Sequence, residues 1–443
     1  QSTRLFWITV TGLKINNMVT KPLTKNIDMS RPPLDFKAYA AADGYQSMHV
    51  ISKGLAPGDV LQLVKDSGLK GRGGAGFPTG LKWSFVPMGQ EPAPQKYLVV
   101  NADEMEPGTF KDRLLMEGDP HLLIEGMLIA AYTIQATKAY IFLRGEYFVA
   151  ERALQKAIDE AYTGGMLGKN ILGTGFDLDI VLHTSAGRYI CGEETALLNA
   201  LEGKRANPRA KPPFPQVSGL WGKPTIVNNV ETLCNLPGIM TYGIDWYKSL
   251  TLGSDHGTKL CGVSGKVKNP GCWELPLGTP IRELLEDYAG GMQDGLELRG
   301  FLPGGGSTDF LLPEHLDLTL DYDVIGKAGS RLATGTMIIL DDRTCPVGMV
   351  GNLMKFFAHE SCGFCTPCRD GLPWVDEIFN EFESGRGTEK DLAILHEHVD
   401  YLGPGRTFCA LAPGATAPLG SGLRHFKEDF ERHIHDKKCS YKA

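Results

Sequence analysis

An apolar run passes directly into an acidic one at Tyr97-Leu-Val-Val-Asn-Ala-Asp-Glu-Met-Glu-Pro-Gly108. Residues 97–100 have the composition of a buried strand, and a polar turn begins at the next residue. Ligands of open α/β sheets bind outside the carboxyl ends of the strands, so this turn has the position of a binding site. Its carboxylates and its amide can hold ribose hydroxyls or the polar edge of a ring, although a solvated acidic turn has the same composition.

Strand-like and helical segments alternate on both sides of this turn. Apolar runs predict strands at residues 97–100, 139–143 and 178–183, and helical periodicity predicts helices at 57–67, 121–134, 148–162 and 193–201. Pro and Gly accumulate between residues 203 and 224, which predicts an ordered loop there. We therefore predict an α/β domain at residues 35–250, preceded by an N-terminal extension at residues 1–34.

The pattern changes after residue 250. Segments at 259–265, 271–275, 280–288 and 298–302 read as strand, strand, helix and strand, which predicts a small α+β module at residues 251–340 with a β-grasp arrangement. Helical segments follow at 347–359, 372–383, 389–402 and 418–434. Residues 341–443 are accordingly predicted to form a helical bundle.

The composition of the 443 residues excludes several classes of protein. A net charge of −7 argues against a nucleic-acid-binding surface, and 42% hydrophobic with 22% charged residues excludes a disordered chain. No apolar run reaches the length of about 18 residues that a membrane span needs. Residues 1–19 lack the long apolar region and the cleavage site of a signal peptide, so we predict a reducing, intracellular compartment.

Four of the ten cysteines form a metal-ligand pattern. Cys362-Gly-Phe-Cys365-Thr-Pro-Cys368 is followed at a distance by Cys409, and Gly363 and Pro367 favour the tight turn that brings three thiolates to one centre. Structural zinc sites usually come as two separated pairs, whereas this spacing is typical of an iron–sulfur cluster; zinc remains the alternative. The remaining cysteines lie singly and are interpreted as ordinary or buried thiols: Cys191, Cys234, Cys261, Cys272, Cys345 and Cys439.

The glycines concentrate at Gly71-Arg-Gly-Gly-Ala-Gly-Phe-Pro-Thr-Gly80, which contains the spacing G-x-G-x-x-G. This spacing lets backbone N–H groups approach a pyrophosphate, although here a helix precedes the loop and Pro78 disfavours the usual helix after it. We predict a phosphate-binding loop, with Arg72 and Lys82 as the cations; a turn-rich loop without a ligand is the alternative. Phe77 and Phe85 offer aromatic faces for a base.

A second glycine-containing turn occurs at Ser185-Ala-Gly-Arg-Tyr-Ile-Cys-Gly-Glu-Glu-Thr195, after a predicted strand. The helix that begins near Gly192 offers its N-terminus to an anion. Because Glu193 and Glu194 are adjacent, we expect them to point in different directions, which disfavours a paired acid and base. Favourable charge at the start of a helix is the alternative role for both. Asn228-Asn-Val-Glu-Thr232 adds amide groups before another helix, where helix capping is the alternative role.

Together these motifs resemble the family of NADH-binding flavoprotein subunits of respiratory complex I, the NADH:quinone oxidoreductase. The matching motifs lie in one order between residues 43 and 430: G-R-G-G-A-G-F-P-T-G at Gly71, N-A-D-E-M-E-P-G-T-F-K-D-R at Asn101, R-G-E-Y at Arg144, Y-I-C-G-E-E-T-A-L at Tyr189, K-P-P-F-P at Lys211, G-L-W-G-K-P-T at Gly219, N-N-V-E-T at Asn228 and E-S-C-G-F-C-T-P-C-R at Glu360. Several motifs in one order are far more specific than any one of them.

The resemblance implies a Rossmann-like domain for FMN and NADH, a ubiquitin-like, soluble-ligand-binding β-grasp domain and a helical bundle that carries a 4Fe–4S cluster. It implies FMN contacts from Gly71, Gly73, Lys82, Asn101, Asp103, Gly192, Glu193, Asn228, Asn229 and Thr232. It implies NADH contacts from Gly74, Phe77, Phe85, Glu104, Glu106, Tyr189, Glu194 and Lys211, with adenine between the two phenylalanines. The cluster ligands would be Cys362, Cys365, Cys368 and Cys409. No side chain is expected to act as general acid or base, since FMN accepts the hydride.

The activity implied by the resemblance is NADH:quinone oxidoreduction within a proton-translocating complex. Electrons would leave FMN one at a time through the 4Fe–4S cluster towards quinone. The implied partners are other peripheral-arm subunits, especially a thioredoxin-like 2Fe–2S subunit and the large Fe–S subunit, with no nucleic acid and with membrane contact only through the complex. The implied location is the cytoplasmic face of the bacterial inner membrane, or the matrix side in mitochondria.

The chain departs from the family pattern at a few positions. Ser185 stands where the first glycine of a G-A-G turn is expected, and residues 1–34 and the tail from residue 436 do not resemble the family. One alternative is a flavoprotein subunit of a soluble NAD-linked hydrogenase or formate dehydrogenase, but such relatives often carry extra cysteine-rich domains that this sequence lacks. An alternative of another class is a zinc-binding interaction module.

Overall fold

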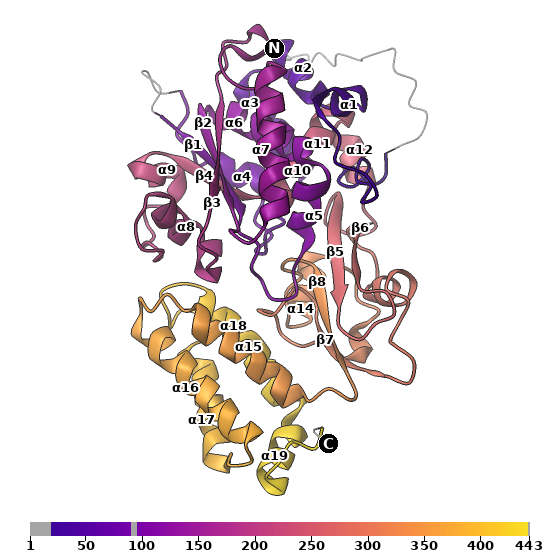
Figure 1. Ribbon diagram of the computed structural model, residues 1–443, viewed down its shortest axis with the longest axis vertical. Coiled ribbons are helices and arrows are strands. Elements are labelled where there is room, and N and C mark those ends of the chain that lie inside the picture. The colour runs from indigo at the N-terminus through magenta and orange to yellow at the C-terminus, as the bar shows by residue number, and fades with distance from the viewer. Residues whose placement is uncertain (1–18, 90–94, 442–443) are drawn as a thin grey trace, which may run out of the picture.

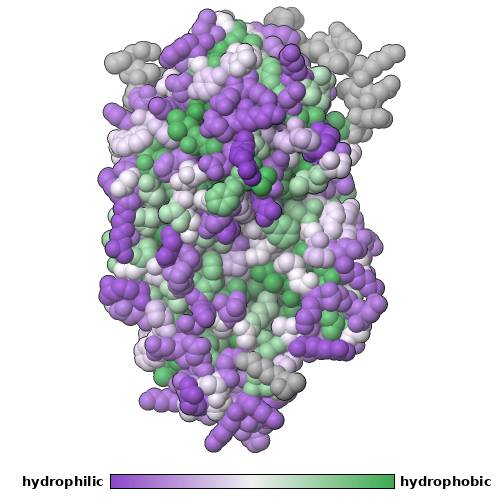
Figure 2. Space-filling view, viewed as in Figure 1, coloured by the Kyte–Doolittle hydropathy of each residue, from purple (hydrophilic) through white to green (hydrophobic). Residues whose placement is uncertain are grey.

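The computed structural model of the chain describes residues 19–89 and 95–441. Its three parts follow one another along the long axis in Figure 1, with the α/β part at one end, a second sheet beside its lower edge and the C-terminal helices at the other end. Polar residues cover most of the outline of the face in Figure 2, and hydrophobic ones show mainly in its middle. Among the helices of the described ranges, none combines the length and the apolar character needed to cross a bilayer. Residues 1–18, on which the prediction of no signal peptide rests, lie outside these ranges.

The first sheet has four parallel strands in the order β3-β2-β1-β4. The strands are β1 Tyr97–Ala102, β2 Lys138–Leu143, β3 Asp179–Thr184 and β4 Thr225–Asn229. The strand order reverses at β1, so the loops after β1 and β4 diverge and leave a crevice at their carboxyl ends. The three predicted strands are confirmed within two residues. Strand β4 was not predicted, because it is short and lies between the Pro-rich loop and a pair of asparagines.

Helices cover both faces of this sheet. Leu98 and Val100 of β1 are buried against one layer, which includes the almost wholly buried α6, whereas Val99 faces α8 and the C-terminal helices. This alternation follows from the two-residue period of a strand. The helices and turns are α1 Phe36–Ala41, α2 Gln46–Ser52, α3 Pro57–Ser67, α4 Thr79–Trp83, α5 Lys111–Gly118, α6 Pro120–Ile134, α7 Phe148–Thr163, η1 Ile171–Gly173, η2 Tyr189–Gly192, α8 Glu194–Leu201, α9 Pro215–Ser218, η3 Leu220–Gly222, α10 Val230–Cys234, α11 Leu236–Tyr242 and α12 Ile244–Ser249.

The second sheet has the order β6-β5-β8-β7, with the central pair parallel and the outer pairs antiparallel. One helix packs on it through Ile281, Leu284 and Leu285, which confirms the predicted β-grasp arrangement. Strand β8, which lies between β5 and β7, was not predicted from the sequence. The elements are β5 Thr258–Ser264, β6 Gly271–Pro276, α13 Ile281–Glu283 continued by the π-helical turn η4 Leu284–Tyr288, β7 Leu298–Leu302, η5 Pro313–His315, α14 Tyr322–Lys327 and β8 Thr336–Asp341.

The C-terminal part is the predicted helical bundle. Its helices are α15 Pro346–Glu360, α16 Thr366–Glu383, α17 Glu389–Tyr401, α18 Leu411–His425 and α19 Lys427–Asp436. The predicted starts of two helices, at residues 372 and 418, are wrong. Pro373 and Pro418 lie inside α16 and α18 rather than in the first turns of these helices. The last predicted helix, at 418–434, is in fact two helices that meet at Phe426.

The three parts share cores and are not separate bodies. The core of the bundle continues onto the sheet through Val99, Phe142 and Val227. In the N-terminal extension, the backbone N–H groups of Leu23 and Thr24 donate to the Glu274 carboxylate on β6 (3.1 and 2.8 Å). Residues 23 and 24 thus join the α/β part to the β-grasp part; the predicted domain limits themselves stay predictions.

Candidate functional site

A cavity of about 1140 Å³ opens at the carboxyl ends of β1 and β4, which is the crevice that the strand order creates. Every residue that the resemblance assigns to FMN or NADH lines it except Lys211. The β-grasp part and the bundle also contribute walls, which were not foreseen from the sequence: Ser307, Arg331, Thr334, Leu411 and Gly414. The cavity exceeds the usual range of about 300–1000 Å³ for a small-molecule site, so it has room for two ligands.

The glycine-rich loop forms one wall by a close backbone approach. Gly74 and Gly76 have φ of +151° and +65°, which favour glycine. A Cβ atom at Gly73 would lie 2.9 Å from Cβ of Asn229, so the loop can pack on the end of β4 only as glycine. The bend closes where Gly71 N–H donates to the Phe77 carbonyl (2.9 Å). As predicted, a helix, α3, precedes the loop. Contrary to the expectation that Pro78 disfavours a helix there, the short helix α4 begins directly after Pro78, which is its N-cap.

Arg72 does not serve the cavity, and the prediction that it supplies charge there is wrong. Its side chain is wholly buried and donates to the Tyr247 hydroxyl (3.1 Å) and to the carbonyls of His256 and Thr258 (2.8 and 3.1 Å). Arg72 therefore fastens the loop to α12 and β5, because adjacent residues of a tight loop point to opposite sides.

Of the two predicted cations, Lys82 is the one that lines the cavity. Its Nζ lies 2.9 Å from Glu194 Oε2 and donates to the Val227 carbonyl (2.8 Å). Lys211 Nζ bridges Glu193 and Glu194 (2.9 and 3.2 Å), so it belongs to this ion-pair group without lining the cavity. The two adjacent glutamates thus converge on one ammonium group, contrary to the expectation that they diverge. The lysines lower the pKa of Glu194 against the opposing effect of burial.

The predicted anion site at the start of α8 is wrong, because the chain fills it. Glu193 is the N-cap of α8, and its Oε2 accepts from the backbone N–H groups of Thr195 and Ala196 (2.9 and 2.8 Å). A carboxylate at a helix start satisfies the unpaired N–H groups and the helix dipole. The role of Glu193 that the structure shows is therefore helix capping at the cavity wall.

Asn101 and Asp103 mark the end of β1 at the cavity. Asn101 Nδ2 donates to the Gly192 carbonyl (3.1 Å), and its Oδ1 accepts from Asp103 N–H (3.2 Å). Asp103 Oδ1 accepts from the Ser185 hydroxyl (3.0 Å), while Oδ2 is buried without a partner among the described residues. Burial raises the pKa of Asp103 to about 7, against the lowering effect of the Ser185 hydrogen bond.

Glu104 turns towards the protein. Its Oε1 accepts from Asp112 N–H (2.8 Å), and its Oε2 accepts from Arg113 N–H and the Tyr147 hydroxyl (3.1 and 3.0 Å). These contacts satisfy the first turn of α5. Burial raises the pKa of Glu104 to about 7. Its predicted contact with NADH stays a prediction, since both carboxylate oxygens already have protein partners.

Glu106 and Tyr189 join the cavity to the other two parts. Glu106 Oε1 accepts from Ser307 N–H (2.6 Å) of the β-grasp part, and its Oε2 accepts from the Tyr189 hydroxyl (2.7 Å). Tyr189 N–H donates to Glu360 Oε2 (2.8 Å) at the end of α15. Burial raises the pKa of Glu106. Glu106 therefore connects the cavity wall to the β-grasp part directly. Through Tyr189 it also connects the wall to Glu360, two residues before Cys362, the first of the predicted ligand cysteines.

A buried network of charges supports the floor at β4. Lys111 Nζ lies 2.7 Å from both Asp112 Oδ1 and Glu231 Oε2, and Asn229 Nδ2 donates to Asp112 Oδ2 (2.6 Å). Thr232 Oγ1 accepts from the backbone N–H of the glycine loop at residue 72 (2.8 Å). Asn228 Oδ1 accepts from Trp83 Nε1 (2.8 Å). Asn228 and Asn229 thus line the cavity, and both side chains have hydrogen-bond partners within the protein.

Phe77 and Phe85 are exposed apolar side chains at the cavity, as are Phe214 and Val217. About half of the side chain of Phe77 and of Phe85 is exposed, 46% and 51% respectively, although both residues line the cavity. An aromatic side chain exposed beside a cavity is a surface for stacking a planar ligand.

The four predicted ligand cysteines gather between the cavity and the bundle. Cys365 is the N-cap of α16, and Gly363 has φ of +72°, which confirms the predicted turn. Cys368 interacts electrostatically with Cys362, Cys365 and Cys409, so the sulfurs share one site. Cys409 also lines the cavity, so the cysteine site and the cavity share this residue as part of a common wall.

The spacing of these sulfurs fits a cluster better than a single ion. A tetrahedral zinc site with Zn–S bonds of about 2.3 Å holds its sulfurs about 3.8 Å apart. In the described part of the chain, no three of the four cysteine sulfurs lie within 4.8 Å of one another. Four thiolates around a wider space match the donor set of a 4Fe–4S cluster.

The cavity residues likewise fit a flavin nucleotide. The glycine loop presents backbone to a phosphate, Lys82 adds a cation, and Asp103 Oδ2 is a buried acceptor without a partner in the described chain. The exposed phenylalanines lie at the same cavity and leave room for a second, base-containing ligand.

Comparison with protein families gives three matches. Residues 64–238 match the Nuo51 FMN-binding domain, residues 261–308 match the SLBB domain, and residues 348–433 match the NADH-ubiquinone oxidoreductase-F iron-sulfur binding region. The last match decides between the two metal centres that the cysteine spacing left open, in favour of the iron–sulfur cluster.

Curated proteins similar to the chain include the F subunit of the NADH-quinone oxidoreductase of Escherichia coli, which is 57% identical over 94% of this chain and 93% of that protein. The corresponding F subunit of Mycobacterium tuberculosis is 50% identical over 91% of each chain. Among solved structures, an NAD+-reducing NiFe-hydrogenase in the H2-reduced state has a TM-score of 0.76 at 36% identity. The match covers 85% of this chain but only 62% of the hydrogenase chain, just under two thirds of its length.

Proposed function

The chain belongs to the family of NADH-quinone oxidoreductase F subunits, and we propose that the residues around its cavity hold FMN and NADH together beside the cluster cysteines. The protein is the NADH dehydrogenase subunit of such an oxidoreductase, with FMN and a 4Fe–4S cluster as cofactors. Bound FMN converts a two-electron hydride donor into a source of single electrons, which the iron–sulfur centre accepts. The hydrogenase alternative is supported only by structural likeness.

We assign FMN to the inner part of the cavity. We assign the phosphate to the backbone of the glycine loop beside Lys82, because the loop offers N–H groups and the lysine offers charge. The flavin ring is assigned to the space beside Asn101 and Asp103, where Asp103 Oδ2 can accept a hydrogen bond. Asn228, Asn229 and the network around Lys111 fix the floor and supply rigidity rather than chemistry.

We assign NADH to the outer part of the cavity. Phe77 and Phe85 are assigned to the adenine, because both are exposed at the cavity. The paired Glu194 and Lys211 at the rim position polar groups of the dinucleotide. Because none of these side chains has to give or take a proton, their work is to bind and orient.

The position of Cys409 carries the proposal for electron transfer. This cysteine belongs to the group of four sulfurs and also lines the cavity. A ligand of the cluster in the cavity wall makes the path from one site to the other short, with no intervening layer of helices.

Anaerobic mixing of the full chain, loaded with FMN and cluster, tests this proposal. Addition of NADH should first bleach the flavin absorbance and then reduce the cluster, seen by electron paramagnetic resonance. A flavin that bleaches while the cluster stays oxidised, although a chemical reductant reduces it, would overturn the proposed path.

The chain works with other subunits of the oxidoreductase, and we propose which ones and where. Phe364 and Phe408 pack edge to face beside the cysteines, with 4.8 Å between ring centroids, and both are about half exposed. We assign this apolar pair to contact with another iron–sulfur subunit, the thioredoxin-like 2Fe–2S protein or the large Fe–S protein, on the cytoplasmic face of a bacterial inner membrane. Cross-linking mass spectrometry of the assembled complex would find these partners; cross-links only to other subunits would contradict the assignment.

A further inference from the structure

Four metal-ligating side chains meet at the end of the bundle opposite to the cluster cysteines. Cys345, Glu383, His433 and Cys439 each place a donor atom so that all four atoms lie within 4.8 Å of one another. His433 and Cys439 are buried, at 1% and 4% exposure, and the other two are partly buried. From the sequence, Cys345 and Cys439 were interpreted as single thiols, because nothing in their local sequence pairs them.

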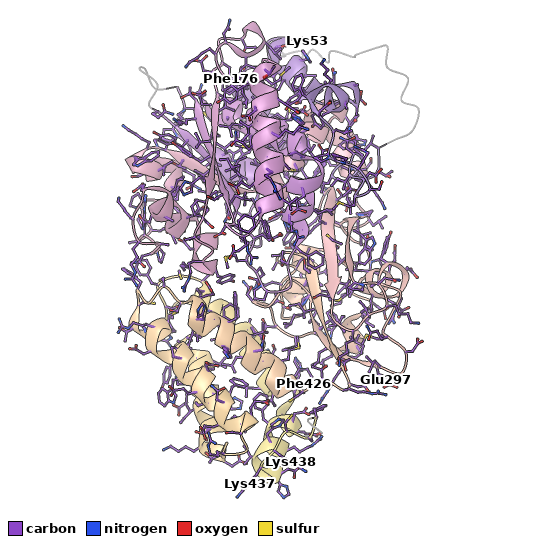
Figure 3. The ribbon with its side chains drawn as sticks, in the orientation of Figure 1. Lys53, Phe176, Glu297, Phe426, Lys437 and Lys438 are labelled. Atoms are coloured by element: carbon purple, nitrogen blue, oxygen red, sulfur yellow. The ribbon has the colours of Figure 1, made fainter. Side chains whose placement is uncertain are left out.

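Separate elements bring the four donors together. Cys345 is the N-cap of α15, Glu383 is the last residue of α16, and His433 lies on α19. Cys439 follows α19 after a turn in which Lys437 has φ of +52°. Figure 3 labels Lys437 and its neighbour Lys438 at the lower end of the bundle, where this turn leads the chain back.

Hydrogen bonds orient two of the donors in the way that metal ligands usually require. His433 Nδ1 lies 2.7 Å from the Asp429 carbonyl, which can only accept, so Nδ1 carries the proton and Nε2 keeps its lone pair. Nε2 lies 3.5 Å from Cys345 Sγ. Gly348 N–H donates to the same sulfur (3.3 Å). The imidazole and the thiol thus present their metal-binding atoms to the same point.

The chemistry and the spacing select the ion. Two sulfurs, one imidazole nitrogen and one carboxylate make a four-ligand set, and soft sulfur with imidazole favours zinc over magnesium or calcium. Zinc bonds of about 2.0–2.3 Å give tetrahedral edges of about 3.3–3.8 Å, within reach of the observed arrangement. The contrast with the four cluster cysteines is clear, since no three of those described sulfurs come within 4.8 Å of one another.

We propose that Cys345, Glu383, His433 and Cys439 bind one Zn²⁺ ion that fastens the C-terminal segment to the bundle. All four positions of the tetrahedron come from the protein, so the site is structural and not catalytic. It ties together the start of α15, the end of α16 and the segment after α19. Since α15 spans 15 residues and is about 22 Å long, the zinc site and the cluster loop at its other end are separate centres.

The test uses the full chain, purified with its iron–sulfur cluster. Metal analysis should find about one zinc per chain beside the cluster iron, and X-ray absorption at the zinc edge should show two sulfur and two nitrogen or oxygen neighbours. The variants Cys439→Ala and His433→Ala should lose most of the zinc and keep the iron. Cys272→Ala, on β6 and away from the four donors, is the matched control and should keep both metals.

Other outcomes would overturn the proposal. Absence of zinc from the wild-type chain, also after incubation with Zn²⁺, would do so, as would zinc that both variants retain. A disulfide between Cys345 and Cys439, found by peptide mass spectrometry without reduction, would show that the two thiols serve as a covalent link instead. If the variants do not fold, the X-ray absorption spectrum of the wild-type chain still decides, because the two-sulfur environment is specific to this site.

Discussion

Ser185 Oγ donates a 3.0 Å hydrogen bond to Asp103 Oδ1, and the same hydroxyl accepts from Gly187 N–H (3.1 Å). The residue that stands in place of an expected glycine is therefore a partner of a carboxyl group in the cavity. Burial raises the pKa of Asp103, whereas the hydrogen bond from Ser185 lowers it. Because the effect of burial is larger, the pKa of Asp103 is raised to about 7.

Removal of this hydroxyl should raise the pKa of Asp103 further. Folding raises the pKa of the Asp103 carboxyl group, so the folded chain holds this proton more tightly than the unfolded chain does. The contribution of this group to stability is therefore present at low pH and is lost as the pH rises through about 7. Ser185→Ala should therefore destabilise the flavin-free chain more at about pH 8.5 than at about pH 5.5, by roughly 1 kcal/mol. Denaturant unfolding at the two pH values measures the difference. Ser185→Gly should show the same difference; equal losses at both pH values would mean that the hydrogen bond does not matter.

Phe77→Ala should weaken NADH binding while the flavin is retained. Stacking of a base on an aromatic side chain contributes about 1–3 kcal/mol, so KM for NADH should rise by about 5- to 150-fold. The control is Phe148→Ala, because Phe148 is 64% exposed at the start of α7 and does not line the cavity. Steady-state kinetics with an artificial acceptor and flavin fluorescence measure the two properties. Loss of FMN with unchanged KM would refute the assignment of this loop.

Cys409→Ala should remove the 4Fe–4S cluster, while NADH still reduces the flavin. The substitution takes away one of four thiolates and leaves the residues assigned to FMN in place. Iron content and electron paramagnetic resonance report the cluster, and stopped-flow absorbance reports the flavin. Cys234→Ala, buried beside α6, is the control for loss of a thiol. An intact cluster signal would exclude Cys409 as a ligand.

Lys111→Met should destabilise the chain strongly. It leaves the wholly buried Glu231 with a weaker counter-charge, and loss of one partner from a buried ion pair costs about 3–5 kcal/mol. The double variant with Glu231→Gln should recover part of this loss, because it removes the unpaired charge. Lys156→Met, from an exposed pair with Glu160, should change stability by less than about 0.5 kcal/mol. Thermal unfolding of all three variants provides the measurement, and a double variant no more stable than Lys111→Met would contradict the argument.

The elements with a strong local pattern could be predicted from the sequence. The first three strands, α3, α6 and α7 follow from hydrophobic periodicity. The prediction failed where the local signal was weak or misleading: β4 and β8 were missed, and prolines inside α16 and α18 shifted two predicted helix starts. Packing against neighbouring elements, which the local sequence does not record, keeps those helices continuous.

The same division holds for the site. Sequence alone determined the glycine loop, the polar ends of the strands and the cysteine spacing, since each is a short pattern with its own backbone or ligand requirement. Only the tertiary structure decided that Arg72 points away from the cavity, that Ser185 contacts Asp103, and that Cys345 meets Cys439. Those contacts join residues far apart in the chain. The physical reason is that such contacts depend on how whole helices and sheets pack together, and not on the local backbone preference of each residue.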